Sequence, residues 1–236
     1  MWWLLVVRAL SIANIIIALI IAAFVNFSVR ERMFSFLSSL ILLDMALWAG
    51  FQVANQISPS FLTAIITFSY GLAFAPLALL YVRMFSGQKI GWWRPLVLFA
   101  PWSVISFLSL REGAFFEGIR FESGNMITWG TQPLLLVYET FLFVCVAWLS
   151  FEVKRARDVI TDPKRRRRFG CLVWGLALSF GSTLIMNMIL PMLGIFRFNI
   201  YGPLAILPMS LAIIYLITRY HPFWADKEII PTNNKP

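Results

Sequence analysis

The chain of 236 residues contains seven long apolar runs separated by polar segments. A membrane-spanning helix needs about 20 mostly apolar residues to cross a hydrocarbon core of about 30 Å. Inside that core every backbone N–H and C=O must be satisfied within the segment, which favours helices. The sequence therefore predicts an all-α polytopic membrane protein with seven transmembrane helices. They are expected approximately at residues 9–27, 33–54, 61–82, 92–110, 133–151, 169–190 and 202–220.

The composition excludes an ordinary soluble domain. Hydrophobic residues make up 60% of the chain and charged residues only 13%, whereas a soluble domain has about 25% charged residues. The net charge of +9 does not indicate a nucleic-acid partner, because the Lys and Arg lie in segments between apolar runs and form no separate basic face. Membrane lipids are the first partners that this composition predicts.

The distribution of Lys and Arg predicts the orientation in the membrane. Cytoplasmic loops carry an excess of these residues. With the N-terminus outside, Arg8, Arg111, Arg120 and Arg197 face outward and all other Lys and Arg face the cytoplasm. We therefore expect a multi-pass protein of a bacterial inner membrane, with its C-terminus in the cytoplasm. The long outer segment 111–132 is expected to form a small hairpin or a cap over the bundle.

The sequence contains no catalytic signature. It has no Gly-rich phosphate loop, no zinc-ligand spacing and no nucleophile elbow. Cys145 and Cys171 lie inside apolar runs, where cysteine behaves as a small hydrophobic residue. We expect a protein that is not an enzyme and that uses no cofactor and no metal.

Polar residues within the apolar runs are the candidate ligand-binding residues, because a buried ionisable group is costly in a membrane. They are Asn14, Asp44, Trp48, Glu139 and Asn187. At helical spacing, Asp44 and Trp48 lie on one face. One interpretation is a pocket open to the outside, with Asp44 and Glu139 as its floor. The alternative is a set of interhelical hydrogen bonds, each worth about 1 kcal/mol.

A run of five cations precedes the sixth apolar run. It consists of Lys164, Arg165, Arg166, Arg167 and Arg168. These side chains are candidates for contact with anionic lipid headgroups, at about 1 kcal/mol per charge near the surface. The alternative is that the run acts only as a topological signal.

The order of several features resembles the seven-transmembrane sensor region at the N-terminus of many bacterial histidine kinases. The matching features span most of the chain. They are Trp48 in residues 40–50, Tyr70-Gly71 followed by Pro76 and Tyr81, residues 124–133 (GNMITWGTQP), residues 165–170 (RRRRFG), residues 187–194 (NMILPMLG), Gly202-Pro203 and residues 212–223 (AIIYLITRYHPF). The chain has no phosphoacceptor helix and no ATP-binding motif, so the resemblance implies a sensor-type bundle without a kinase domain.

This resemblance implies a sensor-like domain at residues 1–223 and a short cytoplasmic tail at residues 224–236. The expected function is non-enzymatic signalling, in which an extracytoplasmic or lipid-borne ligand is perceived and the signal passes to a cytoplasmic signalling protein or through a homo-oligomer. The alternative is a small-solute transporter or a permease-like subunit. A membrane-embedded enzyme acting on lipids is a third hypothesis, with less support because no His or acidic cluster lies at an interface beyond Asp226 and Glu228.

Overall fold

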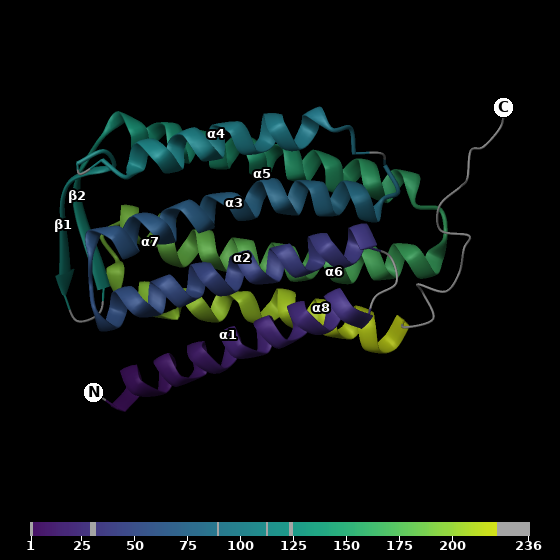
Figure 1. Cartoon of the computed structure of the whole chain (residues 1–236), viewed down its shortest axis with the longest axis horizontal. Coiled ribbons are helices and arrows are strands. Elements are labelled where there is room, and N and C mark those ends of the chain that lie inside the picture. The colour runs from purple at the N-terminus through teal and green to yellow at the C-terminus, as the bar shows by residue number, and fades with distance from the viewer. Residues whose placement is uncertain (1, 29–31, 89, 112, 123–124, 221–236) are drawn as a thin grey trace.

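The computed structural model describes residues 2–28, 32–88, 90–111, 113–122 and 125–220, so the tail predicted at residues 224–236 lies outside it. The long helices run side by side along one axis and form a bundle (Figure 1). The described elements are α1 (Trp2–Ser28), α2 (Arg32–Ile57), α3 (Phe61–Phe85), α4 (Trp93–Ser109), β1 (Phe116–Glu122), β2 (Asn125–Thr131), α5 (Pro133–Val159), α6 (Pro163–Leu184), the π-helix η1 (Ile185–Ile189), α7 (Leu190–Met192), the 3₁₀-helix η2 (Phe196–Ile206) and α8 (Leu207–Tyr220).

Six helical segments in the described part of the chain are long and apolar enough to cross a membrane, which confirms a polytopic membrane protein. They are Trp2–Phe27, Phe34–Ile57, Phe61–Phe85, Pro133–Val159, Pro163–Ile189 and Phe198–Leu216. The fourth predicted span corresponds to α4, which has only 17 residues and contains Pro101. That length is at the lower limit for crossing the hydrocarbon core.

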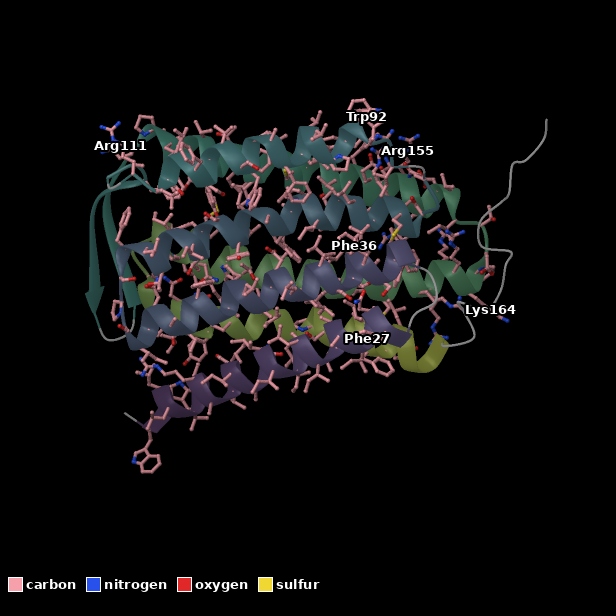
Figure 2. All side chains as sticks on the ribbon, viewed as in Figure 1. Phe27, Phe36, Trp92, Arg111, Arg155 and Lys164 are labelled. Carbon is pink, nitrogen blue, oxygen red and sulfur yellow. The ribbon has the colours of Figure 1, made fainter. Side chains whose placement is uncertain are left out.

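A β-hairpin closes one end of the bundle (Figure 1). Strands β1 and β2 pair antiparallel, with Gly118 opposite Trp129 and Glu122 opposite Asn125. The prediction of a hairpin or cap within segment 111–132 is confirmed, and this hairpin is an exception to the all-α class. We call this end of the bundle the hairpin end. The opposite end, where Arg155 and Lys164 lie, is the basic end (Figure 2).

Helices α2 and α3 form the centre of the bundle. The most apolar windows of these helices are 61% and 67% buried, against 28% for α1 and 22% for α5. The largest side chains that are fully buried include Tyr81, Ile41 and Leu72. The side chains of Leu10, Ile20 and Phe143 are exposed, as expected where helices face lipid, since lipid tails are as apolar as the side chains.

Helix α6 is capped at its start and irregular at its end. Asp162 accepts hydrogen bonds from the backbone N–H groups of Lys164 and Arg165, and Pro163 occupies the first turn, where its missing N–H costs nothing. At the other end the chain passes through η1 and α7 into η2. A 3₁₀ run as long as the 11 residues of η2 is uncommon. Irregular backbone inside a membrane requires hydrogen-bond partners from the protein.

Candidate functional site

The face of α2 that carries Asp44 and Trp48 points into the bundle. Trp48 packs against Gly71 of α3, where an added Cβ would lie 3.3 Å from the indole Nε1 and 3.8 Å from the hydroxyl of Tyr138. One turn further along α2, Phe51 stacks on Tyr70 with ring centroids 5.8 Å apart. Aromatic residues of α2, α3 and α5 therefore meet on this face.

Two of the predicted polar residues are brought to the irregular segment that follows α6. The amide nitrogen of Gln52 donates to Asn187 Oδ1 at 2.5 Å and to the backbone carbonyl of Asn199 at 2.9 Å. From α1, the amide nitrogen of Asn14 donates to the carbonyl of Pro203 at 3.3 Å. We call Asn14, Gln52, Asn187 and Asn199 the amide cluster. It joins α1 and α2 to η1 and η2.

Gly202 allows the amide cluster to close. A Cβ at this position would lie 2.6 Å from Asn187 Oδ1, 2.6 Å from Gln52 Nε2 and 2.7 Å from Gln52 Oε1. These distances are shorter than any ordinary contact with a Cβ. The two side-chain amides therefore occupy the space that any other residue would fill.

A second set of hydrogen bonds extends the cluster toward the hairpin end. Gln56 donates to the carbonyl of Ile200 at 3.4 Å, and Arg8 of α1 donates to the carbonyl of Gln56. Strand β2 lies against η2. Carbonyl groups of η2 are thus held by side chains from α1 and α2, which is how irregular backbone is satisfied inside a membrane bundle.

The amide cluster retains unused hydrogen-bond acceptors. Gln52 Oε1, Asn14 Oδ1 and Asn199 Oδ1 are buried and have no partner. The side-chain N–H groups of Gln52 and Asn14 donate to carbonyls of η2, whereas their side-chain oxygens accept no hydrogen bond. Because an unsatisfied buried polar atom is costly, the cluster is suited to accept hydrogen bonds from the N–H or O–H groups of a ligand or of water.

The two predicted acidic residues are not joined to this cluster by any described hydrogen bond. Asp44 is only 6% exposed, and its Oδ2 has no partner. Glu139 is half-buried on α5 and makes no hydrogen bond or ion pair with a described residue. The structure thus places Asp44 beneath Trp48 on the inner face of α2. No contact between Asp44 and Glu139 is described, and the pocket floor stays a hypothesis.

An ion pair at the basic end was not predicted from the sequence. Arg83 of α3 pairs with Glu152 of α5 at 3.0 Å, and both side chains are buried. Trp148 donates its indole N–H to the same carboxylate oxygen at 3.1 Å. The other oxygen of Glu152 is buried without a partner. The predicted span ends at residue 151 and does not include Glu152. The sequence feature that could have indicated this ion pair is an acidic residue one helical turn after Trp148.

The five cations at the start of α6 separate into two environments. Lys164, Arg166 and Arg167 are exposed, whereas Arg165 and Arg168 are half-buried. Arg165 donates to the carbonyl of Phe85 at 2.8 Å, so it binds the C-terminal end of α3, where a cation is favoured by the helix dipole. The exposed cations remain the candidates for headgroup contact.

The described residues contain no group of three or more His, Cys, Asp or Glu side chains that could hold a metal ion. No family model, curated protein or solved structure matches this chain.

Proposed function

We propose that this chain is a non-enzymatic signalling module of a bacterial inner membrane, with seven spans, an external N-terminus and a cytoplasmic C-terminus. In this proposal the amide cluster lies at the ligand-facing side, and the segment η2–α8 carries its state to the basic end. A ligand that favours one of two bundle arrangements would shift the equilibrium between them. The receiving partner is a cytoplasmic signalling protein or a second copy of the chain.

The observation that carries the proposal is the continuity of η2 and α8. The carbonyls of Asn199, Ile200 and Pro203 are held by side chains from α1 and α2. These residues belong to η2, which passes directly into α8 at Leu207. Any exchange of hydrogen bonds between the amide cluster and η2 therefore acts on a segment that continues into α8 toward the basic end.

The seventh span of the proposal is α4. It lies alongside α3 and α5 over much of the bundle (Figure 1), and it contacts both helices. Its exposed side chains include Leu96, Val97, Val104 and Phe107. A short helix with an apolar outer face, packed against two spanning helices, is expected to cross the membrane where the bilayer thins locally.

Labelling of α8 tests the proposal. We would place a single cysteine at Leu216, which is buried, in a chain with Cys145→Ser and Cys171→Ser, and measure its maleimide labelling rate in membranes. Gln52→Ala removes the hydrogen bonds to Asn187 and Asn199, and we expect it to change that rate several-fold.

The matched control for this experiment is Asn55→Ala. Asn55 also lies on α2, but it bonds to Ser60 and Thr63 rather than to η2, so the rate should stay at the wild-type value. An unchanged labelling rate in the Gln52→Ala variant would show that the cluster and α8 are not coupled, and the proposal would fail.

A small-solute transporter is the second candidate, and the broken helix favours it. Transporter sites are often formed by discontinuous helices near the middle of the membrane, and here α6 gives way to η1 next to Asn187 and Gln52. Solute uptake by sealed proteoliposomes separates the two functions. Flux that depends on Gln52 would support transport.

A further inference from the structure

A second polar site lies where the start of α4 meets the end of α5. Arg155 is exposed on α5 and makes no hydrogen bond or ion pair with a described residue. Its charge and that of Arg94 both act on the buried Arg83. Glu152, one turn before Arg155 on α5, is engaged by Arg83. Arg94 and Arg155 therefore lie in one region of positive charge that includes Arg83, and like charges at short range destabilise one another.

The surroundings of these cations are those of a membrane interface. Trp92 is 80% exposed and Trp93 is 48% exposed, and Trp rings favour the level of the lipid headgroups. The guanidinium of Arg94 lies over the Trp93 ring, 5.4 Å from its centre. Trp92 and Arg155 lie at the same end of the bundle (Figure 2).

Apolar side chains continue from this point along the outside of the bundle. Phe151, one turn before Arg155 on α5, is 61% exposed, and Val97, one turn after Arg94 on α4, is 51% exposed. Residues one turn apart share a helix face. An occupant of the site would therefore meet cations at one end and an apolar surface along its length.

We propose that Arg94 and Arg155 bind the phosphate of an anionic phospholipid, with its acyl chains along Phe151 and Val97. The negative charge of the phosphate reduces the repulsion that Arg94 and Arg155 exert on Arg83. This site is separate from the exposed cations Lys164, Arg166 and Arg167, and it does not depend on the function proposed above.

Native mass spectrometry of the full chain in mild detergent tests this site. Phosphatidylglycerol is titrated against wild type and against Arg155→Gln. One cation near the surface is worth about fivefold in affinity, so we expect about fivefold weaker binding of the first lipid. Adding Arg94→Gln should weaken it about fivefold again. Arg155 has no described partner, so its variant should unfold at the wild-type temperature.

Arg157→Gln is the matched control. Arg157 is also exposed on α5 and has no described partner, but two residues along a helix it points in a different direction. The proposal requires that this variant retain wild-type affinity and that phosphatidylcholine bind more weakly than phosphatidylglycerol. Equal losses in both variants would mean unspecific attraction and would overturn the site. Displacement by glycerol 3-phosphate would identify a soluble anion as the ligand and would also overturn it.

Discussion

Arg83 of α3 and Glu152 of α5 lie 69 positions apart in the sequence and form a buried ion pair, with 3.0 Å between a guanidinium nitrogen and Glu152 Oε1. Trp148 adds an indole N–H to the same carboxylate oxygen. Compared with apolar residues of similar size, a buried ion pair adds little to the free energy of unfolding. Each partner nevertheless needs the other, because loss of one leaves the other charged and buried.

The ion pair makes the first prediction. Arg83→Leu or Glu152→Leu alone should lower the free energy of unfolding by about 3–5 kcal/mol, whereas the double variant Arg83→Leu/Glu152→Leu should recover most of that loss. Thermal or denaturant unfolding in detergent measures all three. Additive losses in the double variant would mean that the two charges contribute independently.

Gly202 makes the second prediction. Gly202→Ala places a methyl group within 2.6 Å of Asn187 Oδ1, and such overpacking typically costs about 1–3 kcal/mol. Combining it with Gln52→Ala should restore part of the stability, since two of the three close contacts of the added methyl group are with Gln52. Gly181→Ala on α6, where a Cβ meets nothing within 4 Å, is the control and should not destabilise. A neutral Gly202→Ala would show that the cluster rearranges freely.

Asp162 makes the third prediction, on pH. Backbone hydrogen bonds from Arg165 and then Lys164, together with the positive charges of Arg168 and Lys164, lower the pKa of Asp162. Its contribution to stability is therefore complete above the unfolded-state pKa of about 3.9 and is lost as the pH falls through the lower folded-state pKa. Asp162→Asn keeps the cap but removes this titration. At pH 7 wild type should melt at a higher temperature than the variant, because only its carboxylate interacts with the charges of Arg168 and Lys164, and this difference should shrink below about pH 4.

The number of spans makes the fourth prediction. A reporter active only in the cytoplasm, fused after Gln88 or after Asp162, should be active. The same reporter inserted after Gly113, ahead of β1, should be silent. With six spans and α4 outside the membrane, the fusions after Gln88 and Gly113 would instead lie on one side and give the same signal. This comparison therefore tests the status of α4 directly.

The sequence was sufficient to predict the helices, because the hydropathy of a segment indicates whether it can lie in lipid. It was less informative about helix ends. Helix α5 continues to Val159 and α6 begins at Pro163, well outside the apolar runs, because capping by Asp162 and backbone hydrogen bonding sustain a helix beyond the hydrocarbon core. Glu152 was missed for this reason.

The candidate site was predictable only in part. Asn14 and Asn187 could be identified as polar residues within apolar runs, but their partners could not: Asn14 donates to the carbonyl of Pro203 in η2, and Asn187 accepts from Gln52. The run at residues 202–220 suggests one regular helix, whereas the structure has a 3₁₀ segment up to Ile206. That irregularity depends on tertiary hydrogen bonds from Gln52 and Asn14, and local sequence does not report such bonds.

The 3₁₀ geometry of η2 also has a mechanical consequence. A 3₁₀-helix rises about 2.0 Å per residue and an α-helix about 1.5 Å, so rewinding the 11 residues of η2 as α-helix would shorten it by about 5 Å. That distance is close to one α-helical turn. With the hairpin end held in place, α8 would move along its axis by this amount and rotate past Gly175, whose missing side chain lets α6 and α8 approach closely at Ala212. Distances between spin labels on α6 and α8 would detect the displacement.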